Sequence, residues 1–347
     1  ISESNTSPDV VIFANTLSSY SSSQENLSTI ISEELGLSDI TTFKIESSSC
    51  SGAMAVNIGH KLLNSDNLES VLIIGAEKMT DLSPAETIKA TALGESYEYT
   101  QFFGITMNSL YALFSRLYME KHDVTSEALS QFSVLSHKNS VTCKHAQFNR
   151  EFSLDSINKS ATISSPLRML NCSPIGDGSA SLVLSKTNNS NFDDVNILSS
   201  TSSNSSTSFF SREDLLKFYS TTRCLNKSLA ESKIKLEDID LLEIHDVVPA
   251  ITANILETMG FSKPGNASSD VISGKYDLNS KVTLSSSGGL KARGNPLSAT
   301  GIYQIIEVTR QLQNRSHTDL ENKNIGLCHN MSGIDSNTVV HILGVAN

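Results

Sequence analysis

Strand-length apolar runs alternate with amphipathic helices in the first part of the chain, and this alternation constrains the fold more than any other feature. Residues 9–14 and 71–75 read as buried strands, and residues 43–46 as a shorter strand. Helices are predicted over 27–35 and over 53–63, where apolar residues recur at intervals of four. Parallel strands joined by helices are covered on both faces, so they appear as continuous apolar runs. The pattern predicts an α/β fold with a parallel sheet.

A second series of strands and helices follows later in the chain. Its strands are predicted at 241–245, 282–284, 325–329 and 339–343. We therefore expect two halves, the first over residues 1–187 and the second over 213–347. A helical subdomain is predicted as an insertion in the first half at about 81–172, where no strong strand pattern occurs. Residues 188–212 are rich in Ser, Asn and Thr and are predicted to form a surface loop.

Composition excludes several classes of protein. The 347 residues carry a net charge of -11 without any basic run, which argues against nucleic-acid binding. No apolar run reaches the about 18 residues that a membrane-spanning helix needs, and no signal peptide is recognisable. The five cysteines are an odd number at irregular spacings, so we expect reduced thiols, a cytoplasmic location and no metal site. The chain begins at Ile1 rather than at Met.

The most reactive position that the sequence indicates is Cys50. It follows the strand at 43–46 and a run of serines, and it precedes the helix that begins near Gly52. A thiol at a helix N-terminus has a lowered pKa, and the thiolate is the nucleophile. The alternative is a buried cysteine that only packs. The small polar residues around Cys50 favour the nucleophile. We therefore expect an open corner and a lowered pKa of the Cys50 thiol.

Polar residues follow the predicted strands of the second half. His245 ends one strand, a glycine-rich turn occupies 286–301, and Cys328, His329 and Asn330 end another strand. Ligands of open α/β sheets bind beyond the carboxyl ends of strands. These segments and the Cys50 corner are therefore predicted to share one pocket.

Six short motifs in this order resemble the thiolase superfamily, closest to its SCP2-type and archaeal acetyl-CoA acetyltransferase branch. The motifs lie at residues 49–52, 75–79, 172–178, 243–246, 288–294 and 329–330. The resemblance implies two βαβαβαββ halves in a five-layer αβαβα arrangement, with a helical loop domain inserted in the first half. It also implies that a βα unit of the family is missing before Ile1.

The resemblance assigns roles to the motif residues. Cys50 would accept an acyl group from acyl-CoA, and His245 would help to bind the enolate oxygen. The backbone N–H groups of Cys50 and of the loop around His329 and Asn330 would bind the tetrahedral oxyanion. Cys328 stands about where thiolases keep a second catalytic cysteine, and a core role is equally open. His329 is a site residue or family scaffold.

Other residues carry weaker assignments. Lys291 and Arg293 contact CoA phosphates or form a solvated basic turn. The remaining histidines have no motif around them and are interpreted as structural or surface residues: His60, His122, His137, His145, His317 and His341.

The chain departs from the family at its acid–base groups. Where the family has Gly-His-Pro, this chain has Gly294, Asn295 and Pro296, and an amide has no basic lone pair to take a proton. Where the SCP2-type enzymes have His-Asp-Cys-Phe, this chain has His245, Asp246, Val247 and Val248, so a candidate acid–base thiol is absent. Cys50, His245 and Asn295 also resemble the Cys-His-Asn triad of the ketoacyl synthase III branch.

Three functions remain open from the sequence. The first is an acyl-CoA C-acyltransferase that condenses or cleaves 3-ketoacyl-CoA such as acetoacetyl-CoA. The second is a ketoacyl synthase III-like decarboxylative enzyme, and the third is a weakly active scaffold subunit. Coenzyme A thioesters are expected as substrates, with no permanently bound cofactor. Expected partners are a second copy of the chain, paired through residues 42–45, and the HMG-CoA synthase and OB-fold protein that accompany archaeal relatives.

Overall fold

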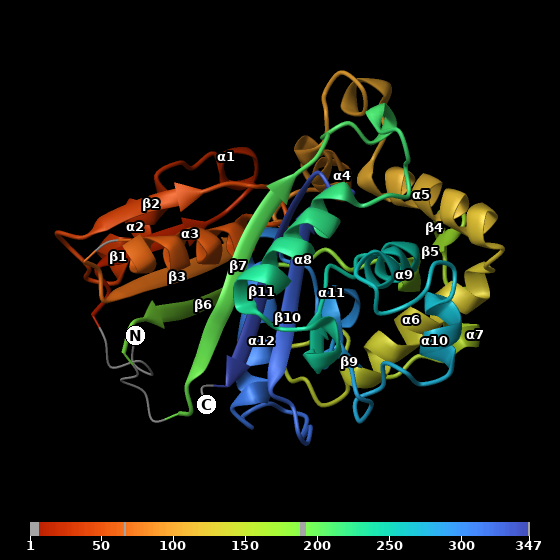
Figure 1. Ribbon diagram of the computed structural model, residues 1–347. Coiled ribbons are helices and arrows are strands. Elements are labelled where there is room, and N and C mark those ends of the chain that lie inside the picture. The colour runs from red at the N-terminus through yellow and green to blue at the C-terminus, as the bar shows by residue number, and fades with distance from the viewer. Residues whose placement is uncertain (1–6, 66, 188–191, 346–347) are drawn as a thin grey trace.

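The computed structural model describes residues 7–65, 67–187 and 192–345. Two sheets form its frame (Figure 1). The first sheet has the order β2-β1-β3-β6, with strands Thr41–Ile45, Val10–Ala14, Ser70–Glu77 and Gly178–Ser185. β1 pairs in parallel with β2 and β3, whereas β6 runs antiparallel to β3. All of β1 is buried, as its continuous apolar sequence predicts.

The second sheet has the order β7-β11-β10-β8-β9. Its strands are Val195–Asn204, Asn337–Val345, Ile325–Ser332, Leu241–Glu243 and Thr283–Leu284. β10, β8 and β9 are parallel, and β11 runs antiparallel to both of its neighbours. The carboxyl ends of the parallel strands of this sheet therefore point toward one edge, where the loops after β8 and β9 begin.

Two helices fill the space between the sheets. α3 (Ser51–Ser65) and α12 (Thr300–Leu312) pack against each other and share one apolar core with both sheets. Their N-terminal ends approach so closely that only glycine fits. A Cβ added at Gly52 would lie 2.2 Å from the Ser298 carbonyl oxygen, and one at Gly301 would lie 2.5 Å from the Ala53 nitrogen. Glycine thus sets the distance between the two halves.

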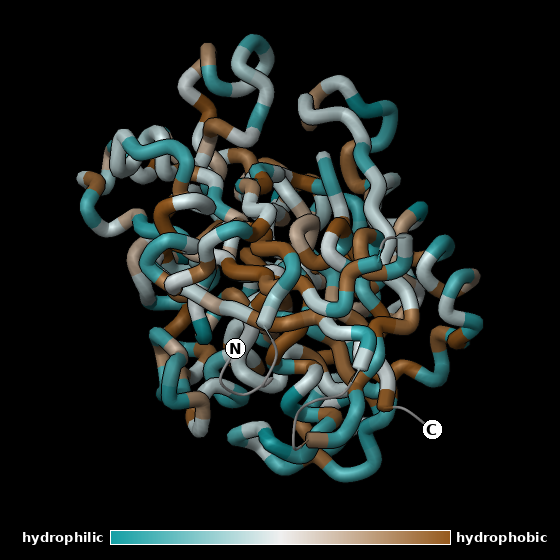
Figure 2. Tube along the Cα trace, turned by 90° about the vertical axis from the view of Figure 1, so that its left-hand side faces the viewer, coloured by the Kyte–Doolittle hydropathy of each residue, from teal (hydrophilic) through white to brown (hydrophobic). Residues whose placement is uncertain are grey.

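Helices on the outer faces complete five layers. α1 (Ser18–Ser21) and α2 (Leu27–Glu34) lie on the first-sheet side, and α2 contacts β1 and β2. α8 (Tyr219–Ser232) covers β7 and β11, and α9 (Pro249–Thr258) packs beside it. The αβαβα arrangement is the one that the sequence predicts, and Figure 2 shows the apolar chain gathered inside it.

A helical insertion separates β3 from β6, as predicted, and lies on the right of Figure 1. Its helices are α4 (Pro84–Thr91), α5 (Met107–His122), α6 (Ser126–Asn139) and α7 (Leu154–Lys159), with 3-10 turns η1 (Ala92–Gly94), η2 (Gln101–Phe103) and η3 (Met169–Asn171) and the hairpin β4 (Thr162–Ser164) and β5 (Leu167–Arg168). Thr125 caps α6 by accepting a hydrogen bond from the Ala128 N–H. The short elements η4 (Phe209–Ser211), η5 (Leu236–Asp238), α10 (Ala267–Ile272), α11 (Gly289–Ala292) and η6 (Leu297–Ala299) belong to the second half.

The predicted surface loop over 188–212 is wrong for its central part. Residues 195–204 form β7, the longest strand of the second sheet, while residues 188–191 lie outside the described part of the chain. Several of the hydroxyl groups that suggested a loop form hydrogen bonds inside the protein. Ser200 contacts Asn57 and His341, and Thr201 contacts Ser228. Composition does not reveal such partners, because they come from distant elements.

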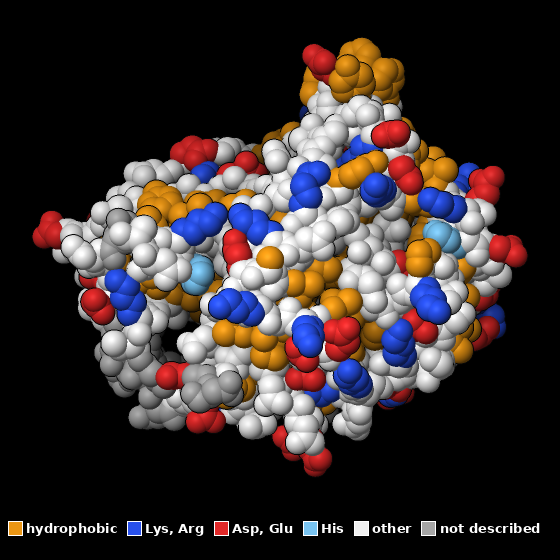
Figure 3. Space-filling view, in the orientation of Figure 1, with side chains coloured by type: hydrophobic (Ala, Val, Ile, Leu, Met, Phe, Trp, Pro, Cys, Tyr) orange, Lys and Arg blue, Asp and Glu red, His pale blue; other side chains and the backbone are white. Residues whose placement is uncertain are grey.

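Four aromatic side chains are exposed on the segment that joins η1 to α5. Tyr97, Tyr99, Phe102 and Phe103 each expose more than half of their surface. An apolar tip protrudes at the top of the molecule in Figure 3, where Figure 1 places this segment. Within the described residues, no helix combines the length and apolar character needed to cross a bilayer.

Candidate functional site

A cavity of about 500 Å³ lies where the two halves and the helical insertion meet. The first half contributes Ser48 and Ser49 from the corner before α3, and the second half contributes Val247, Asn295, Leu297 and Gly333. The insertion supplies the remaining wall, which includes Glu95, Tyr111, Phe148, Cys172 and Ser173. The corner and the second-half loops therefore do contribute residues to one cavity, as predicted. The individual side chains differ from those expected.

Cys50 does not face this cavity. Its side chain is 0% exposed, and it is not among the described residues that line the cavity. The sulfur lies 3.1 Å from the Ser47 carbonyl oxygen and 3.0 Å from the Ser332 hydroxyl. The expectation of an open corner around this thiol is wrong, because β10 closes over it from the second half.

The electrostatics of Cys50 also differ from the prediction. Burial raises the pKa of the thiol above its ordinary value, and the hydrogen bonds from Ser332 and Ser47 offset only part of that effect. The Cys50 N–H is directed to the Ser47 carbonyl oxygen at 3.2 Å and to the Ser332 hydroxyl at 3.3 Å. It is therefore already paired and does not offer a free oxyanion donor.

Ser48 and Ser49 are the corner residues that line the cavity, and Ser49 is the one next to Cys50. Ser49 is half-buried. The chain turns sharply here, with Ser48 in the left-handed region at φ 49 and α3 beginning at Ser51. Successive residues of such a turn point in different directions. The corner therefore contributes serines, and not the Cys50 thiol, to the described lining of the cavity.

His245 and His329 are buried and are not among the described residues that line the cavity. They are 1% and 0% exposed, and burial lowers the pKa of each to about 3, so both rings are neutral at physiological pH. The Asn330 amide nitrogen lies 3.1 Å from Nδ1 of His245. Donation by this amide places the ring proton of His245 on Nε2. His329 instead contacts the Thr221 hydroxyl at 3.0 Å, which is consistent with a structural role.

Cys328 belongs to the core. It is 1% exposed, packs between the sheets with Leu241 and Ile305, and burial holds the pKa of its thiol well above the usual range. Of the predicted triad of Cys50, His245 and Asn295, only Asn295 lines the cavity among the described residues. Cys50 and His245, which are 0% and 1% exposed, are not among the described lining residues.

Asn295 occupies a central position. It lines the cavity described above and also a second cavity of about 360 Å³, which lies beyond the 293–296 loop. Its Oδ1 accepts a hydrogen bond of 2.9 Å from the Thr300 hydroxyl, which orients the amide. Its Nδ2 lies 3.5 Å from the Ser173 hydroxyl. The Nδ2 group thus remains a donor for an oxygen atom in the first cavity.

Lys291 and Arg293 do not form a solvated basic turn, contrary to one of the predicted alternatives. They are 2% and 4% exposed. Arg293 Nη1 lies 3.5 Å from a carboxylate oxygen of Glu243. Lys291 Nζ lies 5.5 Å from the ring centre of Phe148, without a hydrogen-bond partner, and burial lowers its pKa to about 8. Buried Lys291 offers no surface charge to CoA phosphates.

Acidic residues of the sequence motifs hold the loops around the cavity. Glu77 accepts hydrogen bonds from the Thr16 and Leu17 N–H groups and from the Ser298 hydroxyl. Asp177 accepts from the N–H of Met79 at 2.6 Å, and Asp246 accepts from the N–H of Leu290 at 2.7 Å. These carboxylates fix backbone turns rather than contact a substrate.

Two cavity residues with altered acidity were not foreseen from the sequence. Glu95 is 5% exposed, and burial raises its pKa to about 7, although Arg212 acts in the opposite direction. Cys172 is half-buried at the cavity wall, and burial raises its pKa to about 11. A carboxyl group that titrates near neutral pH is suited to proton transfer. Glu95 stands in a segment without a motif, so nothing in the sequence marks it.

Comparison with known families identifies both halves of the chain. A family model described as "Thiolase, N-terminal domain" matches residues 4–188, and one described as "Thiolase C-terminal domain-like" matches residues 201–345. Acetyl-CoA acetyltransferase of Methanothermobacter thermautotrophicus is 32% identical over 323 residues, which cover 92% of this chain and 84% of that protein. The enzyme of the same name from Methanocaldococcus jannaschii is 32% identical over 331 residues, with the same coverage.

More distant similarity extends to other branches. Sterol carrier protein 2 of Bos taurus is 27% identical over 326 residues, covering 89% of this chain and 60% of that protein. The solved structure of the Ltp2-ChsH2(DUF35) aldolase has a TM-score of 0.82 at 19% identity, covering 97% of this chain and 87% of that chain. A monomeric SCP2-thiolase-like protein from Mycobacterium smegmatis has a TM-score of 0.71 at 14% identity, covering 98% and 68%. At these identities the two structures establish the fold alone.

Proposed function

The chain belongs to the thiolase family, and from this premise we propose that it transfers acyl groups of coenzyme A thioesters, using the Ser49 hydroxyl as acceptor. The two archaeal relatives are acetyl-CoA acetyltransferases, which supports an acyltransferase activity at the level of the family. The observation that carries the finer proposal is the lining of the first cavity. It presents Ser49 and Asn295 from opposite halves of the chain, while Cys50 is buried.

The chemistry follows from these groups. The Ser49 oxygen attacks the thioester carbonyl, an O–C bond forms, and the C–S bond breaks. The proton of the serine leaves with CoA as the thiol. Glu95, whose pKa of about 7 leaves it partly ionised at neutral pH, is the cavity group suited to move that proton. The Asn295 Nδ2 donates to the developing oxyanion.

A second acyl-CoA then reacts with the acylated serine. Ionised Glu95 takes its α-proton, and the enolate carbon attacks the ester carbonyl. The C–O bond to Ser49 breaks, the serine oxygen takes the proton back from Glu95, and the 3-ketoacyl-CoA leaves. The reverse sequence cleaves 3-ketoacyl-CoA with CoA. A serine ester is less reactive toward carbon nucleophiles than a thioester, so we expect slow turnover relative to cysteine-dependent thiolases.

The test is intact-protein mass spectrometry after incubation with a panel of acyl-CoAs. We expect an acyl adduct on the wild type and on Cys50→Ala, and none on Ser49→Ala. Loss of the adduct in Cys50→Ala alone would instead show that substrate binding exposes the thiol. Thiolysis of acetoacetyl-CoA, measured on the same three proteins, separates acylation from turnover.

A second candidate is an aldol-type carbon–carbon cleavage without any acyl-enzyme. It is favoured by one observation: the cavity contains a carboxyl group with a pKa near 7, whereas the thiol at its wall, Cys172, has its pKa raised by burial to about 11 and Cys50 is not among the described lining residues. Glu95 would take the hydroxyl proton of a 3-hydroxyacyl-CoA, the C–C bond would break, and a carbonyl compound and an acyl-CoA enolate would result. Product formation without added CoA and without an adduct would support this candidate over acyl transfer.

Partners remain a proposal as well. We propose that the chain assembles with a second copy of itself, and an HMG-CoA synthase and an OB-fold protein stay candidates from the family resemblance. A purely scaffolding role is disfavoured, because a scaffold needs neither a cavity of about 500 Å³ nor a carboxyl group poised near neutral pH inside it. Absence of adduct, thiolysis and cleavage across the panel would restore the scaffold interpretation.

A further inference from the structure

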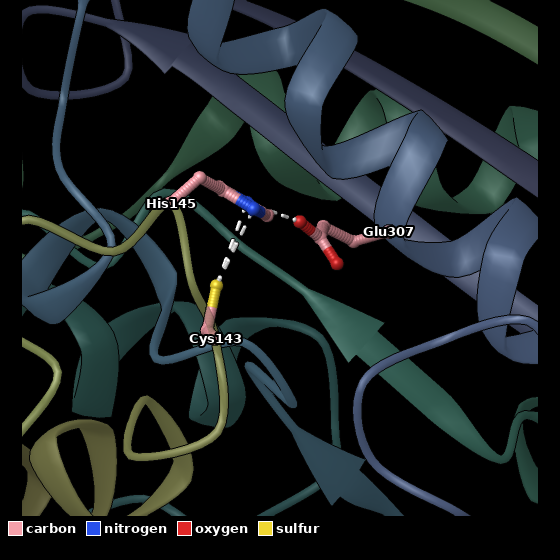
Figure 4. A group of neighbouring side chains, drawn as sticks. All are labelled: Cys143, His145 and Glu307. Atoms are coloured by element: carbon pink, nitrogen blue, oxygen red, sulfur yellow. Dashed lines mark hydrogen bonds and ion pairs between the residues drawn. The ribbon is translucent and has the colours of Figure 1, made fainter.

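Three potential metal ligands meet outside the first cavity. Cys143 and His145 lie on the loop that follows α6, and Glu307 lies on α12, more than 160 residues further along the chain. Figure 4 shows the His145 ring between the Cys143 sulfur and the Glu307 carboxylate. One ligand atom of each residue lies within 4.8 Å of the other two. The sequence did not suggest this group, because no local spacing links Glu307 to the other residues.

The distances agree with a shared ion. The sulfur is 3.5 Å from Nε2 of His145, and Nε2 is 2.9 Å from Oε1 of Glu307. A tetrahedral zinc ion with bonds of about 2.3 Å to sulfur and about 2.0 Å to nitrogen and oxygen holds its ligand atoms about 3.3–3.6 Å apart. The two pairs that involve His145 are therefore within a few tenths of an ångström of these distances, and the sulfur and the carboxylate oxygen, which lie within 4.8 Å of each other, would close on the ion.

The surroundings resemble the shell of a metal site. The second oxygen of Glu307 accepts a hydrogen bond from the Ser287 hydroxyl, which fixes the carboxylate. The His145 ring stacks on Tyr303 with centroids 5.8 Å apart. His317 lies beside it, with ring centres 6.4 Å apart, and its Nε2 is buried without a hydrogen-bond partner. That nitrogen is available as a further ligand.

We propose that Cys143, His145 and Glu307 bind one zinc ion, with a fourth position that faces the second cavity and is filled by water or by His317. Thiolate, imidazole and carboxylate in a tetrahedral arrangement favour zinc over harder ions such as magnesium. Cys143 is 0% exposed and Glu307 2%, whereas the His145 side chain is 39% exposed and lines the second cavity. Solvent therefore reaches the ion only from the side of His145.

The ion would join the helical insertion to the second half. The loop that carries Cys143 and His145 continues into Gln147 and Phe148, whose N–H groups donate to the Arg293 and Ala292 carbonyl oxygens. This segment supports the Asn295 loop, which separates the two cavities. Zinc at this position would therefore stabilise the wall of the acyl site without taking part in the proposed acyl transfer.

An ion pair alone is the competing interpretation. It accounts for the contact of His145 with Glu307 but not for the buried thiol beside the same ring, whose sulfur lies 3.5–3.7 Å from both nitrogens. Arg293 and Lys291 are the buried cations of this region, and Arg293 shares its cavity with His145. Binding of zinc replaces the thiol proton of Cys143, which is released to solvent.

The experiment uses the full chain, freed of metal with a chelator and then titrated with zinc. We expect one tightly held zinc per chain by elemental analysis, and thiolate-to-metal charge-transfer absorption when cobalt replaces zinc. Cys143→Ser, Glu307→Gln and His145→Gln are each expected to weaken zinc binding at least about 10-fold. Cys224→Ser is the matched control, since that buried thiol donates to the Thr338 carbonyl oxygen, far from the site in sequence.

Circular dichroism verifies that each variant is folded, and His145→Gln, at a partly exposed position, keeps the test valid if a buried variant unfolds. No stoichiometric zinc on the folded wild type would overturn the proposal. Equal zinc binding by wild type and all three variants would overturn it too. Acyl adduct formation at Ser49 is measured separately, so failure of the zinc site and failure of the proposed function are distinguishable.

Discussion

The Ser332 hydroxyl lies 3.0 Å from the Cys50 sulfur, across a sequence separation of 282 residues. The same hydroxyl donates to the Ser47 carbonyl oxygen at 2.6 Å, so the end of β10 is fastened to the corner before α3. This contact joins the two halves next to Ser48, Ser49 and Gly333, which line the cavity. It also explains why the thiol is buried although its neighbours in the sequence are small and polar.

Cysteine reactivity should follow burial rather than motif. With iodoacetamide under native conditions, we expect Cys172 to be alkylated first, because it alone is half-buried among the free cysteines, while the other four are buried. Ser332→Ala should increase labelling of Cys50, and Ser336→Ala, whose hydroxyl contacts only the Ser332 carbonyl oxygen, should not. Peptide mapping by mass spectrometry gives the order. Labelling of Cys50 before Cys172 would contradict the geometry.

Glu95 should make stability depend on pH. Its pKa rises from 4.5 to about 7 on folding, so the native state retains the proton more strongly than the unfolded state between these values. This contribution to stability is present below about pH 4.5, falls as the pH rises toward 7, and is then constant. Glu95→Gln should thus gain up to about 3 kcal/mol over wild type at pH 8 and much less at pH 5. Urea denaturation at both pH values measures the difference.

The same substitution should lower activity while it raises stability. If the turnover of Glu95→Gln at pH 7 rose or stayed unchanged, Glu95 would have no part in the proposed proton transfer. Equal stability of wild type and variant at pH 8 would show that the carboxyl group is not strained by burial.

Asn295→Asp should test the role of the Asn295 Nδ2 group as an oxyanion donor separately from the orientation of the side chain by Thr300. Aspartate retains the oxygen that accepts from Thr300 but lacks the Nδ2 donor. Loss of one oxyanion donor costs about 10²–10³-fold in kcat with little change in KM. Thr300→Val is the comparison, since it removes the orienting hydroxyl and keeps the amide. Steady-state kinetics with the acyl-CoA that labels the wild type measure the effect. A kcat of Asn295→Asp equal to that of the wild type would refute the donor role.

Gly52 and Gly59 of α3 should respond differently to alanine. The added methyl of Gly52→Ala would meet the Ser298 backbone at 2.2 Å, whereas that of Gly59→Ala would meet the movable end of Ile73 at 3.0 Å. We expect a loss of about 1–3 kcal/mol or more for Gly52→Ala. For Gly59→Ala, the gain in helix propensity of about 1 kcal/mol offsets the contact. Urea denaturation that ranked the two variants in the opposite order would contradict the packing of α3 on α12.

Assembly should involve β2. This strand is the edge of the first sheet, only Thr41 of its residues is fully exposed, and an unpaired edge favours pairing with another copy. Light scattering should detect a dimer at micromolar concentration. Amide hydrogen exchange of the peptide spanning β2 should slow as the protein concentration rises. Exchange of the peptide spanning β7, an edge strand of the other sheet, is the control and should not change. A monomer throughout this range would count against the prediction.

The sequence by itself determined the architecture. Val10–Ala14 and Ser70–Glu77 are strands because a strand covered on both faces requires apolar residues without interruption. The strand-to-helix corner at Cys50 and the motifs around Glu77, Asp177 and Asp246 were likewise recognisable. The residue types were visible in these motifs, but their partners were not, because the carboxylates accept from backbone N–H groups 44 to 98 residues away.

The tertiary structure alone decided which side chains form the site. Whether Ser49 or Cys50 faces the cavity depends on where α3 begins and on how β10 covers the corner, and a shift of one residue exchanges the two. The acidity of Glu95 comes from burial among distant elements. The contact between His145 and Glu307 spans 162 residues. Periodicity reports the environment of one element at a time, whereas a site is made where several elements converge, and that convergence is set by packing across the whole chain.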